Sequence, residues 1–278
     1  MSAPELVLRD TAGSVRLLTL NRPDRRNALS VELLRELVVA LEEATDDPGI
    51  SVIVLRGAGK GFSAGFDLAA GYTGPRTIWT DRERLRRSNR ALDEVFNTPL
   101  PVIAQVHGFA IAGGADLALH CDLLVCADDA RIGFPPVRNL GVPPTNMWLY
   151  RLGPQLAKRM LLTGDSVTGA EAHQLGLAIE SHAPEALDDA VLALADRMGK
   201  VGREMLIGNK HVLNRGIDLM GRATLARIAE TEDAVAHTAP PALAFRERVG
   251  EIGLAPALRE RDAAFAPDPP GLAERRAD

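Results

Sequence analysis

Short apolar runs alternate with helix-like apolar stripes along the first two thirds of the chain. The apolar runs predict strands at Glu5–Arg9, Ser14–Asn21, Ile50–Arg56, Pro101–Val106, Leu123–Ala127 and Ala130–Gly133. Apolar residues recurring every three or four positions predict helices at 31–45, 81–97, 115–120, 146–162, 169–175 and 186–198. Strands and helices that alternate in this way predict an α/β fold.

The pattern changes after Gly202, where only helix-like stripes remain. They predict helices at Glu204–Arg215, Leu219–His237, Leu243–Gly250 and Ala255–Phe265. We therefore divide the chain into an α/β core over residues 1–201 and a helical region over residues 202–278. A helical region after an α/β core is a candidate for docking or oligomerisation.

The stretch Pro101–His120 has the richest local chemistry of the chain. A buried strand is followed by Gly113 and Gly114, which let the backbone turn and approach a ligand, and then by a helix. Backbone N–H groups at such a turn suit an anion, either bound or formed during a reaction. Asp116 lies in the first helical turn and can reach the same point. The alternative is a tight turn in which Asp116 only favours the start of the helix.

A second glycine-rich segment, GAGKGFSAGFDL at residues 57–68, follows the predicted strand at 50–56. Its glycines at 57, 59, 61 and 65 do not have the spacing of a dinucleotide-binding loop, and Lys60 is not placed as in a phosphate-binding loop. The segment still exposes backbone amides. We therefore expect the two glycine loops to face each other and to supply one donor each.

Composition excludes several classes of function. The 32 Lys and Arg residues against 37 Asp and Glu residues give a net charge of −5, which disfavours nucleic-acid binding. No stretch is long and apolar enough for a membrane span or a signal peptide, so we expect a cytoplasmic protein. Cys121 and Cys126 have no metal-ligand spacing, and we expect neither a metal nor a redox cofactor.

Five segments in order resemble the crotonase superfamily, the enoyl-CoA hydratase and isomerase family. The resemblance covers roughly residues 15–265. The matching segments are Asn21–Ser30, Gly57–Leu68, His107–Leu117, Cys121–Asp128 and Leu161–Leu177. It implies a spiral of ββα units and a C-terminal helical part that forms a homotrimer or a hexamer, as a dimer of trimers.

The resemblance also implies an acyl-CoA substrate and a thioester enolate that is held by two backbone amides. Carried over by motif, the amides are those of Phe66 and Gly113, and Asp116 is the catalytic carboxylate. The residues implied in substrate and CoA binding are Arg25, Arg26, Ala28, Ala64, Asp67, Leu68 and, from a neighbouring subunit, Phe265.

The sequence departs from the family's hydratases at one catalytic position. Those enzymes use two glutamates; here Asp116 stands at the first position and Pro136, in the proline-rich connection 134–145, at the second. Proline cannot transfer a proton, and no Asp or Glu occurs between Ala130 and Thr163. Other polar or aromatic candidates near the site are His120, Asn139, Thr145, Asn146, Trp148 and Tyr150.

Hydration of a 2-enoyl-CoA is the first reaction to consider, because it is the family's most frequent activity. Double-bond isomerisation, decarboxylation and thioester hydrolysis are alternatives within the superfamily, since they use other arrangements of acids. A protein that binds acyl-CoA without catalysis is the alternative from a different class.

Overall fold

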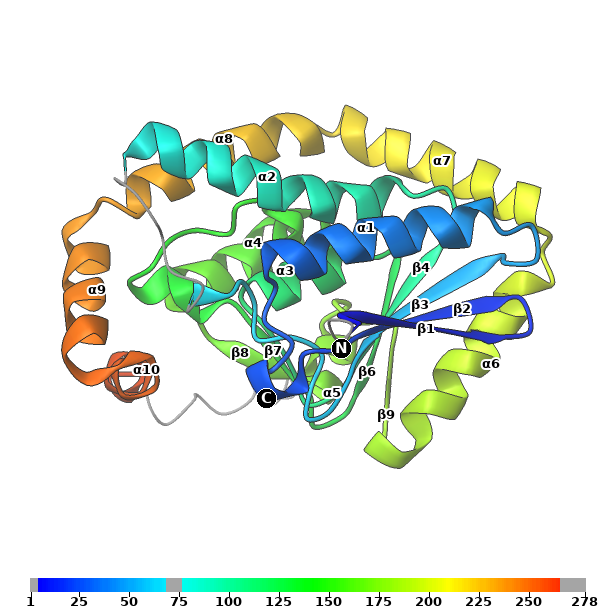
Figure 1. The fold of residues 1–278 in the computed structure, drawn as a ribbon, viewed down its shortest axis with the longest axis horizontal. Helices are drawn as coiled ribbons and strands as arrows, with labels where there is room; N and C mark the ends of the chain where they lie inside the picture. Colours follow the sequence, from blue (N-terminus) through cyan, green and yellow to red (C-terminus); the bar gives the residue numbers. More distant parts are fainter. Residues whose placement is uncertain (1–4, 69–76, 266–278) are drawn as a thin grey trace.

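A six-stranded sheet and a smaller three-stranded sheet form the centre of the protein (Figure 1). The structure is a computed structural model that describes residues 5–68 and 77–265. The large sheet has the order β1-β2-β3-β4-β6-β9, and the small sheet has the order β5-β7-β8. In the large sheet β1 is antiparallel to β2, and all further pairs are parallel.

The strands lie close to the predicted runs, with three additions. Their bounds are β1 Val7–Ala12, β2 Val15–Leu20, β3 Val52–Gly57, β4 Val102–Val106, β5 Phe109–Ile111, β6 Leu123–Ala127, β7 Arg131–Gly133, β8 Ser166–Thr168 and β9 Glu180–His182. The sequence analysis missed β5, β8 and β9, which have only three residues each. Such short strands carry too few positions for an alternating pattern to be recognised.

The helices also follow the predicted stripes. Their bounds are α1 Val31–Asp46, α2 Ile78–Asn97, α3 Gly113–His120, α4 Met147–Thr163, α5 Gly169–Gln174, α6 Leu187–Gly199, α7 Arg203–Leu219, α8 Arg222–Ala236, α9 Pro240–Ile252 and α10 Leu254–Ala263. The α/β class and the C-terminal helices are therefore confirmed. The connection 134–145 was predicted to be irregular, but it contains the 3₁₀ helix η3, Pro135–Arg138.

Helices cover both faces of the large sheet. Helix α1 packs on β1 and β2, whereas α6 packs on β2, β3, β4 and β6 (Figure 1). Ser30 caps α1, because its side chain accepts a hydrogen bond from the Leu33 amide. The strands β3 and β4 between these layers are almost fully buried, so the main core lies here.

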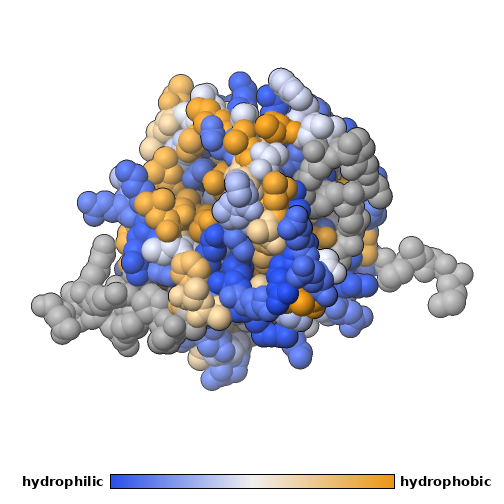
Figure 2. Space-filling view, turned by 90° about the vertical axis from the view of Figure 1, so that its left-hand side faces the viewer, coloured by the Kyte–Doolittle hydropathy of each residue, from blue (hydrophilic) through white to orange (hydrophobic). Residues whose placement is uncertain are grey.

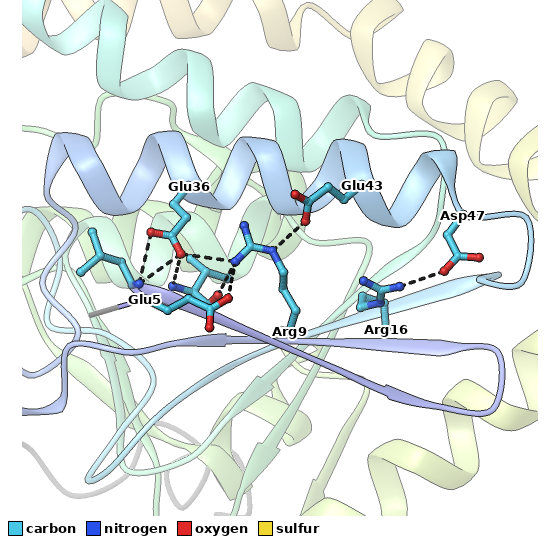
Figure 3. A network of polar contacts seen from close by, with 8 residues as sticks. Glu5, Arg9, Arg16, Glu36, Glu43 and Asp47 are labelled. Atoms are coloured by element: carbon cyan, nitrogen blue, oxygen red, sulfur yellow. Dashed lines mark hydrogen bonds and ion pairs between the residues drawn. The ribbon is translucent and has the colours of Figure 1, made fainter. Parts of the chain in front are cut away.

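A polar network fastens α1 to the edge of the sheet (Figure 3). Arg9 on β1 contacts Glu43 at 2.7 Å and Glu36 at 3.3 Å, and Arg16 on β2 contacts Asp47 at 2.9 Å. Glu36 also accepts hydrogen bonds from the backbone amides of residues 6 and 7. Because the ion pairs are partly exposed, each contributes about 1 kcal/mol or less, and the network mainly fixes the position of the helix.

The C-terminal helices are joined to the core through α2. Helix α8 packs along α2, and α9 and α10 form the end of the molecule beside it (Figure 1). Seen from that end, hydrophobic side chains gather toward the upper part of the surface (Figure 2). The division between residues 201 and 202 stays a prediction. Part of the second region, residues 266–278, lies outside the described residues.

The helices of the described ranges include no segment whose length and apolar character would suit a bilayer span. Cys121 and Cys126 are both buried, and neither forms a disulfide.

Candidate active site

The two glycine loops lie against each other, as the sequence predicted. Ser63 in the first loop pairs with Ala110 in β5, and the Ile111 amide donates to the Ser63 carbonyl at 3.0 Å. The approach requires glycine at position 114, because a Cβ atom there would lie 2.3 Å from the Ser63 carbonyl oxygen. The contact fixes the first loop relative to the start of α3.

The amides of Phe66 and Gly113 reach one cavity from these two loops. The neighbours of Phe66 pair with Leu29: the Leu29 amide donates to Gly65, and the Asp67 amide donates to Leu29. Gly113 precedes the first helical hydrogen bond of α3, so its N–H has no acceptor within the helix. Across residues 5–68 and 77–265, neither amide has a hydrogen-bond acceptor.

The cavity has a volume of about 550 Å³ and is lined mainly by apolar groups. Its lining includes Phe66 and Gly113 from the two glycine loops, and Pro136 and Gly141 from the connection 134–145. The Phe66 ring covers Gly113 so closely that a Cβ atom at position 113 would lie 2.6 Å from its Cδ2 atom. An anion between the two amides would therefore be shielded from water on this side, which strengthens its hydrogen bonds.

Asp116 lies in the first turn of α3 and has no exposed surface. Its Oδ1 atom accepts a hydrogen bond from Trp148 Nε1 at 3.2 Å, while Oδ2 has no partner among the described residues. Burial raises the pKa of Asp116 from 3.8 to about 8; the bond from Trp148 acts against this shift, and the charge of Asp233 adds to it. The carboxyl group therefore holds a proton at neutral pH.

Pro136 and the segment behind it also line the cavity. The resemblance places the second acid of hydratases at the position of Pro136. The Pro136 carbonyl accepts hydrogen bonds from the amides of Leu140, at 2.7 Å, and Gly141, at 3.1 Å. These bonds place Gly141 one tight turn beyond Pro136. Both residues face the cavity.

Three titratable residues that the sequence analysis did not select form a cluster, of which Asp233 and His237 line the cavity and Asp81 does not. They are Asp81 in the first turn of α2, Asp233 in the last turn of α8, and His237, which caps α8. His237 Nδ1 contacts the Asp81 carboxylate, and Nε2 lies 3.5 Å from Asp233 Oδ1. Asp233 and His237 are four residues apart near a helix end, and that spacing was the one available signal in the sequence.

The predicted CoA-binding segments run side by side. The Ala64 amide donates to the Arg26 carbonyl at 3.0 Å, and Ala64, Asp67 and Leu68 line the cavity. Arg25 and Arg26 are exposed outside it. Arg22, which the sequence analysis did not select, holds this region together, because it pairs with Asp67 at 2.9 Å and donates to the Ala28 carbonyl.

Phe265 lies away from the cavity lining, at the end of α10. Its ring stacks against Arg138 of the same chain, with the guanidinium 4.0 Å from the ring centre. The predicted contact with a neighbouring subunit stays a prediction. The Tyr150 hydroxyl reaches the Met220 carbonyl at 3.4 Å, and Tyr150 does not line the cavity.

The remaining candidates from the sequence are polar or aromatic groups close to α3 and α4. His120 is buried, and its Nδ1 atom bonds to the Asp116 carbonyl oxygen at 2.7 Å. Burial lowers the pKa of His120 to about 4, so it stays neutral at physiological pH. Asn139, Thr145 and Asn146 do not line the cavity. Trp148 is the candidate that contacts Asp116.

Within the described ranges, no group of three or more His, Cys, Asp or Glu side chains has a geometry that could hold a metal ion.

Comparison with known proteins places this chain among acyl-CoA enzymes. The family model for enoyl-CoA hydratase/isomerase matches residues 10–241. The chain is 36% identical to a 2,3-dehydroadipyl-CoA hydratase of Escherichia coli, over 79% of this chain and 88% of that protein. It is 31% identical to a peroxisomal Delta(3,5)-Delta(2,4)-dienoyl-CoA isomerase of Arabidopsis thaliana, over 83% of this chain and 88% of that protein.

Solved structures agree with this result. An enoyl-CoA hydratase of Mycobacterium smegmatis superposes with a TM-score of 0.90 and 34% identity, covering 95% of this chain and 96% of the other. An enoyl-CoA hydratase/isomerase of Xanthobacter autotrophicus gives a TM-score of 0.88 at 31% identity, covering 94% and 98%. The similar proteins therefore share one fold and include both hydratases and isomerases.

Proposed function

Because the chain belongs to the enoyl-CoA hydratase/isomerase family, we propose that it adds water to the double bond of a 2-enoyl-CoA. The observation that carries this proposal is that Phe66 and Gly113 line one cavity, while the buried, protonated carboxyl group of Asp116 lies behind this lining in the same first turn of α3 as Gly113. Hydratases among its relatives, including a crotonyl-CoA hydratase of Syntrophomonas wolfei, agree with this reaction.

In this proposal the thioester oxygen lies between the amides of Phe66 and Gly113. Attack at C3 of the enoyl group moves charge to that oxygen and forms an enolate. Each amide then stabilises the transition state by about 3 kcal/mol, since its N–H is already oriented and does not have to leave water.

Asp116 supplies the proton for C2. The carboxyl group is protonated below about pH 8, and the enolate carbon is a strong enough base to take this proton. Trp148 holds one carboxyl oxygen at 3.2 Å, which orients the other oxygen for transfer. After this transfer Asp116 is a buried carboxylate. In the reverse reaction this carboxylate takes the C2 proton back from the product.

The segments 25–29 and 64–68 hold the CoA part of the substrate in this proposal. Arg25 and Arg26 are exposed outside the cavity and face the phosphates of CoA. Phe265 packs on the adenine of the CoA that is bound to a neighbouring subunit. Coenzyme A takes part only as a portion of the substrate, and neither a metal nor a redox cofactor takes part. The protein acts in the cytoplasm.

We further propose a homotrimer or a dimer of trimers. Large apolar side chains on and just after α7 are exposed in the single chain, including Leu213 and Leu219, the latter with 89% of its surface accessible. Exposed apolar surface of this kind favours burial between copies of the chain.

Steady-state assays with crotonyl-CoA and longer 2-enoyl-CoA esters test the reaction. Asp116→Asn keeps the shape of the side chain but cannot donate a proton, so turnover should fall about 10²- to 10⁴-fold while CoA-ester binding survives. Asp189→Asn, on the exposed face of α6, is the matched control and should behave as the wild type. Wild-type turnover in Asp116→Asn would contradict the proposal.

The same assays separate the alternative reactions. A 3-enoyl-CoA that is converted without water uptake would assign an isomerase, and release of carbon dioxide from a malonyl-type ester would assign a decarboxylase. Free CoA released from a hydroxyacyl ester would assign a hydrolase. Tight binding of these esters with no turnover would assign a protein that binds acyl-CoA without catalysis.

A further inference from the structure

Hydration needs a group that takes a proton from water, and Asp116 does not fill this role at neutral pH because it is already protonated. Pro136 cannot fill it either. The cavity wall next to Pro136 is therefore the place to look for a proton acceptor. The residues that meet there are Asp233 and His237 from α8.

The position of this pair relative to Pro136 follows from Gly141. Gly141 is tied to the Pro136 carbonyl by a 3.1 Å hydrogen bond. A Cβ atom on Gly141 would lie 2.2 Å from Asp233 Oδ1 and 3.0 Å from His237 Nε2. The absence of a side chain at position 141 therefore lets both groups reach the wall, one turn from the residue that replaces the acid.

The pair is also firmly held. The Val142 amide donates to Asp233 Oδ1 at 2.9 Å, and Asp81 contacts His237 Nδ1 from α2. Arg84 in turn pairs with Asp81 at 2.6 Å. Because a carboxylate accepts only, the Asp81 contact keeps a proton on Nδ1 and orients Nε2 as the atom that exchanges protons.

We propose that His237 Nε2 accepts the proton of the water that adds to the enoyl-CoA, with Asp81 as the positioning residue and Asp233 as the charge that stabilises the imidazolium. The proposal rests on the proposed hydration. It gives the C-terminal helix α8 a direct part in the reaction.

The step balances as an addition of water. The water oxygen forms a bond to C3 while its proton passes to His237 Nε2, and the electron pair of the C2–C3 π bond moves to the thioester oxygen. The enolate then takes the proton of Asp116 at C2. His237 finishes protonated and Asp116 ionised, and exchange of one proton with solvent restores both groups.

The charged groups around His237 come from several elements. Asp81 and Arg84 face it from α2, Asp233 from its own helix, and Arg246 lines the cavity from α9. Asp116 on α3 is close enough for the charge of Asp233 to raise its pKa. His237 thus lies between a carboxylate of α2 and a carboxylate of α8.

Two measurements on the full-length protein test the proposal. The first is hydration of crotonyl-CoA. The second is exchange of the C2 hydrogens of butyryl-CoA with deuterium oxide above about pH 8, where Asp116 is ionised and can take a proton from C2. This exchange needs Asp116 and the two amides but no water activation. His237→Gln should lower kcat for hydration about 10²- to 10⁴-fold and leave the exchange unchanged.

Three further variants sharpen the test. His237→Ala should regain hydration when imidazole is added, because the missing ring leaves space in the cavity. Gly141→Ala should also lower kcat, since its Cβ atom would displace Asp233 and His237. His211→Gln and Gly208→Ala on α7 are the matched controls: His211 is exposed, and a Cβ atom on Gly208 would contact nothing within 4 Å.

Hydration by His237→Gln within about threefold of the wild-type rate would overturn the inference and leave the proposed function intact. Equal loss of hydration and of exchange, without rescue by imidazole, would assign His237 a structural role and also overturn it. A wild-type protein that catalyses the exchange but hydrates no enoyl-CoA would refute the proposed function itself, and the inference with it.

Discussion

Asp116→Asn should change the pH dependence of stability as well as the activity. The Asp116 carboxyl has a pKa of about 8 in the native protein, raised by burial from 3.8. Between these values the unfolded chain ionises the group and the native protein does not, so the unfolded state binds fewer protons. Native stability is therefore lost as the pH rises through this window.

One proton corresponds to about 1.4 kcal/mol per pH unit, so the loss from about pH 5 to about pH 7 is about 3 kcal/mol. Asn cannot ionise and does not contribute this loss. The unfolding free energy of Asp116→Asn relative to the wild type should thus rise by about 3 kcal/mol over the same interval. All other groups, including His120, titrate in both proteins and cancel in the difference.

Urea unfolding at several pH values and one fixed protein concentration measures this difference. Asn can still accept the bond from Trp148, while its amide hydrogens lack an acceptor, which adds an offset that does not depend on pH. The prediction therefore concerns the slope. The unfolding free energy of Asp189→Asn, a change at an exposed position, should vary with pH in parallel with that of the wild type. A difference for Asp116→Asn that is constant from about pH 5 to about pH 7 would refute the reasoning.

Three further predictions concern the amides, the assembly and metal ions. Gly113→Ala should lower kcat about 10²- to 10³-fold, because its Cβ atom would push on the Phe66 ring and displace both donors, whereas Gly208→Ala should not. Light scattering at micromolar concentration should give about three or six times 29.8 kDa; the mass of one chain would contradict the proposed assembly. Activity should survive a chelator, and a loss that a divalent ion restores would contradict metal-free catalysis.

Local patterns in the sequence were sufficient for the long elements of the fold. Helix α1 was predictable because its apolar stripe and the Ser30 cap agree, and β3 and β4 because they are continuous apolar runs. The three-residue strands β8 and β9 were missed since their pairing partners lie far away in the sequence. Their formation depends on contacts that exist only after the sheets are assembled.

The candidate site likewise has parts that local sequence patterns predict and parts that they do not. The loops with Phe66 and Gly113 were found because each carries its own glycine signature, and Asp116 because it follows one of them. The contact between Asp116 and Trp148 joins residues that are 32 positions apart, and no local pattern marks it.

The sequence analysis missed the cluster of Asp81, Asp233 and His237 for a related reason, because the four-residue spacing of Asp233 and His237 was its only local signal. Asp81 and His237 are ordinary at their positions, since acids favour the first turn of a helix and histidine its end. Asp233 lies in the last turn of α8, where the helix dipole does not favour an acid. Only the packing of α8 on α2 brings the start of one helix to the end of the other, and only a glycine at position 141 lets the resulting pair meet the cavity.

This cluster also explains how proton transfer remains possible although proline, and not an acid, stands at position 136. Pro136 shares the cavity lining with Asp233 and His237, which come from a different segment of the chain, the end of α8. The two proton-transfer groups then differ in kind: a neutral carboxyl that gives a proton and an imidazole that takes one. Since these groups lie on different helices, α3 and the end of α8, the proposed addition assigns its two proton transfers to separate side chains.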